Sequence, residues 1–252
     1  MSERDPSTST ADFPQGPPLH LERPGTIARL LSEFVLPARL ARMEQVLSRR
    51  TRRLTALIEG LHDPHNVAAC MRTCEGLGIQ DLHVVPEAGD ELEPSRVVAT
   101  GSGRWLTLHQ HSSTEAALEA LRRAGYRVVA TELAASAPPT PPAQLEVQGS
   151  LCIAFGSERD GISRTLRQGC AGTTCVPMYG FVQSFNISVA FALVMQVLRG
   201  RMLEQAGREG DLTQTDRASL RDAWLLEEVP RAHEIIHEIW RRSGADGEAA
   251  GR

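Results

Sequence analysis

The feature that most constrains this chain is an apolar segment without a polar face, preceded by a polar loop. From Ile187 to Leu198, ten of twelve residues are apolar, and only Ser188 and Gln196 interrupt them. A helix that is apolar nearly all round is buried against other protein, either in its own core or in a partner. The preceding loop, residues 179–186, carries polar side chains that need hydrogen-bond partners. We therefore expect a ligand site at the start of this helix.

The rest of the chain alternates between strand-like and helix-like patterns. Strands are predicted at residues 54–61, 81–86, 106–110, 126–133, 150–158 and 173–178, and helices between them at 66–78, 113–125 and 163–169. This alternation predicts an α/β fold, with a mostly parallel sheet and helices on both faces. Ligands of such sheets bind at the carboxyl ends of the strands. No G-x-G-x-x-G follows the first strand and no P-loop is present, which argues against a dinucleotide oxidoreductase.

Composition limits the remaining possibilities. At 252 residues, one domain of about 150–200 residues with appendages is expected. No apolar run approaches the roughly 20 residues of a membrane span, and we expect no signal peptide and no membrane partner. The five cysteines lack metal-finger spacing, so we expect reduced thiols, a cytoplasmic protein and no metal. Cys70 and Cys74, four residues apart, are expected to pack in the core.

The termini differ from the centre in composition. Residues 1–25 are rich in Pro, Ser and Thr and are predicted to be disordered. A helix is predicted over residues 37–50, with proline near its first turn. Residues 211–243 have an amphipathic helical pattern, and residues 244–252 are expected to be a frayed tail.

Positive charge is concentrated ahead of the first strand. Net charge is −4 and all 27 basic residues are arginine, yet residues 26–53 contain seven arginines and two glutamates. The densest cluster is Arg49, Arg50, Arg52 and Arg53. Such a cluster is either a solvated face or a contact with the phosphates of RNA.

Three segments carry a family resemblance. They read EGLHDPHNVAACMRTCEGLG, IAFGSERDGIS and VPMYGFVQSFNISVAFAL. In order and spacing they resemble the three motifs of the SpoU/TrmH class of SPOUT RNA 2′-O-ribose methyltransferases, over roughly residues 37–205. The resemblance implies S-adenosylmethionine as cofactor, a homodimer, and a C-terminal deep trefoil knot. Sequence patterns alone would not suggest a knot, because knots are rare exceptions to normal chain connectivity.

The resemblance also implies a division of the chain and an activity. The expected parts are a disordered segment (1–25), a basic helical extension (26–53), a methyltransferase domain (54–205), and a C-terminal helical extension with a tail (206–252). The basic helix favours tRNA as partner, with methylation of the ribose of guanosine 18 in the D-loop. Two alternatives remain: a ribosomal RNA 2′-O-methyltransferase, or a catalytically inactive RNA-binding dimer. Residues 211–252 depart from the basic tails of tRNA-modifying relatives, with nine acids against six arginines.

The motifs nominate five catalytic residues. Arg72 matches the family's catalytic arginine, whose guanidinium would stabilise the negative charge that develops on the ribose oxygen. Asn66 would orient that arginine, or serve only as a helix N-cap. Glu158 would hold the cofactor loop and the substrate ribose, or simply cap the next helix. Ser184 and Asn186 match the family's active-site loop and are also suited to cap the last helix.

The same resemblance nominates cofactor-binding residues. Thr131 matches a cofactor-contacting threonine, and Gly156 would allow the backbone to approach the cofactor. Val176 stands where isoleucine is common, and Phe185 where leucine is usual, a change expected to adjust packing without abolishing binding. His65 is a minor candidate for the proton acceptor, whose identity stays open.

Overall fold

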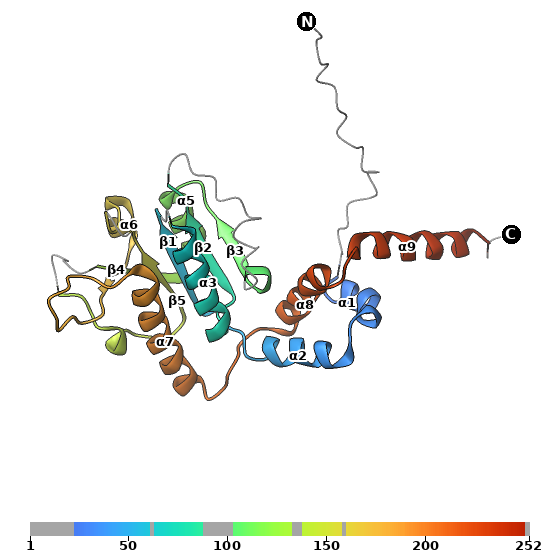
Figure 1. Cartoon of the computed structure of the whole chain (residues 1–252), viewed down its shortest axis with the longest axis horizontal. Coiled ribbons are helices and arrows are strands. Elements are labelled where there is room, and N and C mark those ends of the chain that lie inside the picture. Colours follow the sequence, from blue (N-terminus) through green and yellow to red (C-terminus); the bar gives the residue numbers. More distant parts are fainter. Residues whose placement is uncertain (1–22, 61–62, 88–102, 133–137, 158–159, 250–252) are drawn as a thin grey trace, which may run out of the picture.

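The computed structural model describes residues 23–60, 63–87, 103–132, 138–157 and 160–249, and contains a six-stranded sheet. Figure 1 shows the sheet with its covering helices on the left of the molecule and the N- and C-terminal helices on the right. The strands are β1 (Leu54–Glu59), β2 (Asp81–Val85), β3 (Thr107–Gln110), β4 (Tyr126–Thr131), β5 (Ser150–Phe155) and β6 (Thr173–Thr174). Their order is β3-β2-β1-β5-β4-β6, and every neighbouring pair is parallel. The predicted parallel sheet is therefore confirmed.

Helices cover both faces of the sheet. Alternate residues of β1 point to opposite faces, so the two cores divide along this strand. Ala56 and Ile58 pack in the core beneath α3 (Pro64–Leu77) and α7 (Ile187–Ala206). Leu57 packs in the other core, beneath α5 (Thr114–Arg123) and α6 (Arg164–Gly169). Because both faces are covered, all six residues of β1 are buried, which explains its nearly continuous apolar run.

Local signals set where α3 begins and ends. Its N-cap is Asp63, whose side chain accepts a hydrogen bond from the His65 backbone N–H at 2.9 Å. The helix ends at Gly78, which has φ of 70°, a conformation that favours glycine. The alternative interpretation of Asn66 as the N-cap is wrong, because the helix starts two residues earlier than the predicted range of 66–78.

The N- and C-terminal helices pack into one helical unit. It comprises α1 (Thr26–Leu31), α2 (Pro37–Leu47), α8 (Gln214–Glu228) and α9 (Ala232–Ala249). Elsewhere along the chain, as well as between α1 and α2, short 3-10 helices occur at Ser32–Phe34, Gly103–Trp105 and Pro142–Gln144. Ile27, Leu47 and Leu225 are fully buried in its core. Asp222 of α8 fastens α1 by accepting hydrogen bonds from the backbone N–H groups of Gly25 and Ala28. Helix α9 continues to Ala249, into the range 244–252 that was predicted to be a frayed tail.

Two arginines join the helical unit to the sheet domain. Arg50 is fully buried, donates to the Ile79 carbonyl at 3.3 Å, and lies 5.4 Å from the ring centroid of Trp224 on α8. Arg199 on α7 donates to the carbonyl oxygens of Leu77 and Arg49 at 3.0 and 2.9 Å. The basic segment before β1 therefore belongs to the junction between the two parts of the molecule.

Candidate active site

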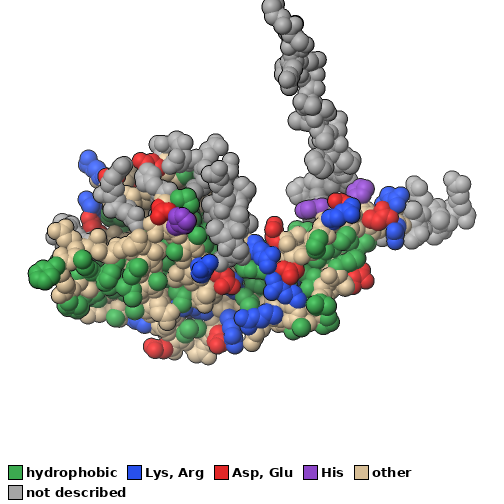
Figure 2. All heavy atoms as spheres, in the orientation of Figure 1, with side chains coloured by type: hydrophobic (Ala, Val, Ile, Leu, Met, Phe, Trp, Pro, Cys, Tyr) green, Lys and Arg blue, Asp and Glu red, His purple; other side chains and the backbone are tan. Residues whose placement is uncertain are grey.

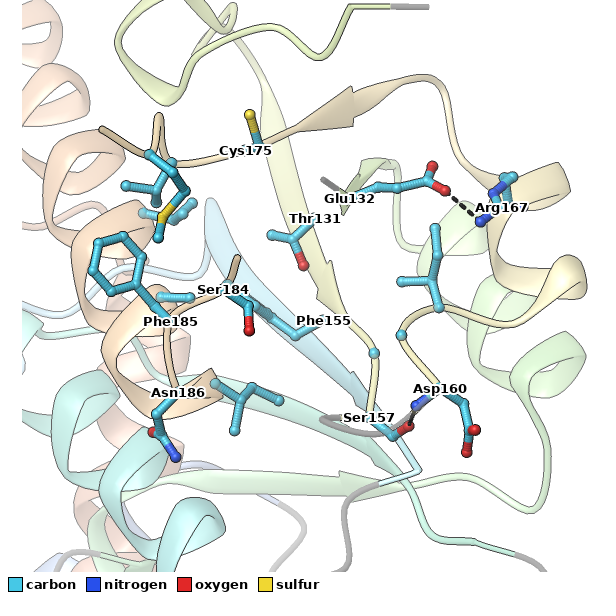
Figure 3. A pocket seen from close by; sticks show the side chains of 18 residues that line it. Thr131, Glu132, Phe155, Ser157, Asp160, Arg167, Cys175, Ser184, Phe185 and Asn186 are labelled. Carbon is cyan, nitrogen blue, oxygen red and sulfur yellow. Dashed lines mark hydrogen bonds and ion pairs between the residues drawn. The ribbon is translucent and has the colours of Figure 1, made fainter. Parts of the chain in front are cut away.

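A cavity of about 560 Å³ opens at the carboxyl ends of β4, β5 and β6 (Figure 3). The sequence predicted a ligand site at this edge of the sheet and at the start of the apolar helix. Residues of three distant segments line the cavity together: Thr131, Gly156, Val176, Ser184, Phe185 and Asn186. All four predicted cofactor-binding residues therefore lie in one pocket, with two of the predicted catalytic residues. Strand β6 has only two residues, shorter than the predicted 173–178, and Cys175, Val176 and Met178 line this cavity.

The cavity combines apolar walls with a few polar groups. Phe155 and Phe191 pack with ring centroids 4.8 Å apart, and Phe155 forms part of the wall. Thr131 donates its hydroxyl to the Ala154 carbonyl at 3.1 Å, which ties the end of β4 to β5. An ion pair between Glu132 and Arg167 lies at one side of the cavity, as the dashed line in Figure 3 marks.

A tight loop after β5 forms one wall. Ser157 and Gly161 exchange two backbone hydrogen bonds, each of 3.0 Å, and the Asp160 N–H donates to the Ser157 hydroxyl at 2.9 Å. A Cβ on Gly156 would lie 2.1 Å from the carbonyl carbon and oxygen of Gly161. Gly156 therefore lets the loop close on itself, a role separate from the predicted approach of a cofactor.

A chain of side-chain hydrogen bonds joins the first and third motifs. Asn186 caps α7, as expected, by accepting from the Ser188 backbone N–H at 2.9 Å. Its amide donates to the Asn66 side-chain oxygen at 3.3 Å, and Asn66 donates to Asp63 at 3.3 Å. Asn66 is 7% exposed, so its amide is held in a fixed orientation beside the pocket.

Arg72 differs from the other nominated residues. It lies on α3 with an exposed side chain, and it is not among the residues that line the cavity. Within the described part of the chain, its guanidinium has no hydrogen bond or ion pair. Glu158, the remaining catalytic nominee, lies outside the described residues.

The predicted RNA-binding arginines divide into different groups. Arg49 pairs with Glu209 at 2.8 Å, and Arg52 pairs with Asp81 and Asp216. Arg53 donates to the carbonyl oxygens of Val147 and Gly149. Arg50 is fully buried, so the prediction that it contacts RNA phosphate is wrong for this structure. Figure 2 shows the same mixing at the surface, where blue and red side chains alternate along the helical unit.

Sequence reasoning missed several residues of the cavity wall. Glu132 and Arg167 were not nominated, although Glu132 directly follows Thr131 and Arg167 lies in the short predicted helix after the second motif. Cys175, directly before the third motif segment, also lines the cavity. Adjacency to a nominated residue was the available signal, but only the fold shows which neighbours face inward.

Among the described residues there are buried cysteines, but no metal-binding cluster and no helix suited to span a membrane. Cys70 and Cys74 are fully buried, which confirms the predicted core packing, and burial raises the pKa of the Cys70 thiol to about 12. Nowhere in the described ranges do three or more His, Cys, Asp or Glu side chains form a group that could hold a metal ion. In the same ranges, no helix combines the length and hydropathy that crossing a bilayer requires.

Fold and site together define a parallel α/β protein with a ligand pocket at the carboxyl ends of its strands. The model of the SpoU rRNA Methylase family matches residues 53–196. A tRNA (guanosine(18)-2′-O)-methyltransferase of Borreliella burgdorferi is 34% identical over 211 residues, covering 83% of this chain and 94% of that protein. The 23S rRNA (guanosine-2′-O-)-methyltransferase RlmB of Pseudomonas aeruginosa is 33% identical and covers 59% of each chain. This chain belongs to the SpoU methylase family.

Solved structures agree with the fold. The crystal structure of the TrmH/SpoU tRNA modifying enzyme of Aquifex aeolicus superposes with a TM-score of 0.67 at 24% identity, covering 77% of this chain and 98% of that one. A structure described as showing the 2-OH methylation of C/U34 on tRNA has a TM-score of 0.51 at 26% identity, covering 64% and 99%.

Proposed function

We propose that this protein transfers a methyl group from S-adenosylmethionine to the ribose 2′-oxygen of guanosine 18 in tRNA. The observation that carries this proposal is the meeting of the three motifs at one cavity and directly beside it. Asn66 of the first motif contacts Asn186 of the third, and the loop of the second motif forms the opposite wall.

The residues of the cavity suit the proposed cofactor. S-adenosylmethionine has a flat aromatic adenine ring, ribose hydroxyls, a positively charged sulfonium and a zwitterionic amino-acid end. Phe155, Val176 and Ile187 offer an apolar surface for the ring. The carboxylates of Glu132 and Asp160 and the guanidinium of Arg167 supply both charges needed by the other end. S-adenosylmethionine, when bound, supplies an electrophilic methyl carbon.

The chain's own residues then orient the reactants and stabilise charge. A ribose hydroxyl is a weak acid, so attack by its oxygen is favoured when a cation lies beside it. Arg72 is exposed and carries no partner within the described residues, so its guanidinium is available to an incoming ribose. Because arginine stays protonated, it acts electrostatically and not as the base. Asn66 and Asn186 hold the adjoining loop in place.

Sequence similarity favours tRNA over ribosomal RNA, because the tRNA (guanosine(18)-2′-O)-methyltransferases of Borreliella burgdorferi, Thermus thermophilus and Escherichia coli match at 33–34% identity over 211, 158 and 159 residues. The family segment covers residues 53–196, whereas the alignment with the Borreliella enzyme runs over 211 residues and so extends into the flanking helices. The 23S rRNA enzyme aligns over 150 residues. The helical unit, which those flanking helices build, is therefore the part of the protein that we assign to tRNA. A cytoplasmic location follows from this substrate, and residues 54–205 would form the catalytic domain between the two extensions.

We also propose that the protein works as a homodimer. The apolar helix α7 is not buried all round: Val189, Leu193 and Val197 are 45%, 42% and 38% exposed. These residues are four apart, so they form one stripe along the helix. Beside the stripe lies an apolar groove of about 480 Å³ between α3 and α7. A second copy would complete the burial expected from the sequence. Light scattering should give twice the chain mass, and Leu193→Glu should give a monomer.

The proposed trefoil knot concerns the path of the chain between β4 and α7. Both ends of the segment 175–187 line the cavity at the ends of β4 and β5, through residues 175, 176, 178 and 184–187. A crystal structure that traces the backbone from Thr131 to Ile187 tests the knot, and an unthreaded path would contradict it.

Methyl transfer is tested directly with purified protein, tritiated S-adenosylmethionine and separate tRNA and ribosomal RNA substrates. We expect label in tRNA, and mass spectrometry of nuclease fragments should map it to the ribose of guanosine 18. Label at position 34, or in ribosomal RNA alone, would change the substrate assignment. Binding of cofactor without any transfer would instead favour an inactive RNA-binding dimer.

A further inference from the structure

Glu59 is a buried carboxylate at the carboxyl end of the central strand β1. The rest of this strand is largely apolar, and Glu59 is only 8% exposed. It accepts three hydrogen bonds: from the Thr114 hydroxyl at 2.5 Å, from the Ser163 backbone N–H at 2.8 Å, and from the Ser163 hydroxyl at 2.7 Å. Both partners stand at helix starts, because Thr114 is the first residue of α5 and Ser163 is the N-cap of α6.

A buried negative charge normally requires a cation, because removing a carboxylate from water is costly. Among the residues that the structure describes, no cation forms an ion pair with Glu59. Its stabilisation comes from the three donors, two of which belong to Ser163. The stabilisation of the negative charge on Glu59 therefore depends on the position of the segment that precedes α6.

That segment is the wall of the cofactor cavity. Gly156, Ser157, Gly161 and Ile162 line the cavity, and Ser163 follows directly. Glu59 does not line this cavity and contacts the loop from behind. Glu59 lines a second cavity of about 250 Å³ together with Ser157 and Gly161 of the loop. The loop therefore borders a cavity on this side as well, and Glu59 is one of the groups that fix its position.

We propose that Glu59 is a positioning residue that fixes the wall of the cofactor cavity through Ser163. Ser163 in turn accepts from the Leu166 N–H at 3.0 Å and caps α6, so one carboxylate sets both the loop and the helix that carries Arg167. This inference rests on the proposed function only for the identity of the ligand.

The test compares Glu59→Gln with a matched buried carboxylate elsewhere. Glutamine keeps the shape of the side chain but has one acceptor oxygen in place of two. We expect affinity for S-adenosylhomocysteine, measured by calorimetry, to fall about tenfold, the effect of losing one hydrogen bond to a charged group. The control is Asp222→Asn, which removes an acceptor from a carboxylate that is 7% exposed in the helical unit. It should lose stability but keep its affinity within about twofold.

Two further measurements separate positioning from a purely structural role. Hydrogen exchange of the amides at 160–163 should accelerate in Glu59→Gln and stay unchanged in Asp222→Asn, whether or not a ligand binds. In methyl transfer, KM for the donor should rise while kcat changes less. Thr114→Val, which keeps the Ser163 contacts, should have the same effects in weaker form and provides a test if Glu59→Gln does not fold.

The same measurements can contradict the proposed role of Glu59. Melting temperatures that fall in both carboxylate variants, with unchanged donor affinity and unchanged exchange at 160–163, would overturn the inference. If the wild type binds S-adenosylhomocysteine but methylates no RNA, the proposed function fails while the positioning role is still decided by affinity and exchange.

Discussion

The Asn186 side-chain amide donates a hydrogen bond to the Asn66 side-chain oxygen, 3.3 Å away and 120 residues earlier in the chain. Asn186 simultaneously caps α7 by accepting from the Ser188 N–H. One side chain thus starts the apolar helix and links it to α3. The bond places the first and third motifs side by side at the edge of the cavity.

Replacing Asn186 with aspartate should separate these two roles. The carboxylate can still accept from Ser188, so the cap and most of the free energy of unfolding are retained. The donor to Asn66 is lost, and two oxygens then face each other, so transfer activity should fall strongly. Asn186→Ala should in addition cost about 1 kcal/mol of stability through the lost cap. Urea unfolding and single-turnover transfer measure the two effects, and equal activity of Asn186→Asp and wild type would contradict the expectation.

Arg72→Ala should strongly lower kcat without affecting the fold. Removal of one electrostatic stabiliser lowers kcat by roughly 100- to 1,000-fold in other enzymes. Because Arg72 is exposed and does not line the cavity, the melting temperature and the affinity for S-adenosylhomocysteine should be unchanged. Arg164→Ala, another exposed arginine on a helix of the same domain, serves as the control. Retained transfer in Arg72→Ala would remove this residue from the mechanism.

The arginines ahead of β1 should respond differently to mutation. Arg50→Ala should cost roughly 3 kcal/mol of stability, because it removes a buried cation that bonds Ile79 and packs on Trp224. Arg49→Ala combined with Arg53→Ala should weaken tRNA binding and make its salt dependence shallower by about one power of salt concentration per lost phosphate contact. Filter binding across a salt series tests this, and an unchanged slope would place the RNA elsewhere.

His83 should make the fold sensitive to acid. Burial, aided by the neighbouring His109 and His111, lowers the pKa of His83 to about 3. The unfolded chain, with an ordinary histidine pKa near 6.5, binds the proton first, so stability falls as the pH drops from about 6.5 towards 3. The loss should reach roughly 2 kcal/mol at pH 5. His83 stacks on His109 and His111, with ring centroids 4.4 and 5.2 Å apart. His83→Phe keeps an aromatic ring in this stack and should flatten the dependence of stability on pH in urea titrations at pH 7, 6 and 5. An equally steep dependence would assign it to other groups.

Gly156→Ala should disrupt the cavity wall. The new Cβ would lie 2.1 Å from the Gly161 backbone, which cannot move without opening the loop. We expect affinity for S-adenosylhomocysteine to fall about tenfold or more. Gly172→Ala is the matched control, because a Cβ added at Gly172 would have no described atom within 4 Å and this glycine stands next to the short strand β6. Calorimetry on both variants decides, and normal binding by Gly156→Ala would show that the loop tolerates the shift.

Much of the fold followed from local patterns. The alternation of apolar strands and capped helices placed all six strands, and the buried run of β1 reflects coverage on both faces. The family resemblance nominated Thr131, Gly156 and Phe185 as residues of a common ligand site, and the structure puts them in one cavity. Their roles as cofactor contacts stay predictions. These results depend on residue type and short-range order, which the sequence records directly.

Local patterns could not predict which distant segments of the chain contact each other. Arg50 has the same local signature as Arg49, yet it is buried beneath Trp224 of α8, which lies far along the chain. The two extensions at the ends of the chain form one helical unit. The partner of a charged side chain depends on which distant segments meet, and local composition contains no record of that.

The sequence by itself determined the class of fold, the three motifs and the edge of the sheet where a ligand would bind, because periodicity and residue chemistry are local properties. Tertiary structure alone decided that Glu59 faces the back of the cavity wall, that Asn66 meets Asn186, and that one face of α7 stays exposed. Each of these depends on the packing of segments separated by tens of residues or more, and the free energy of that packing belongs to the assembled molecule.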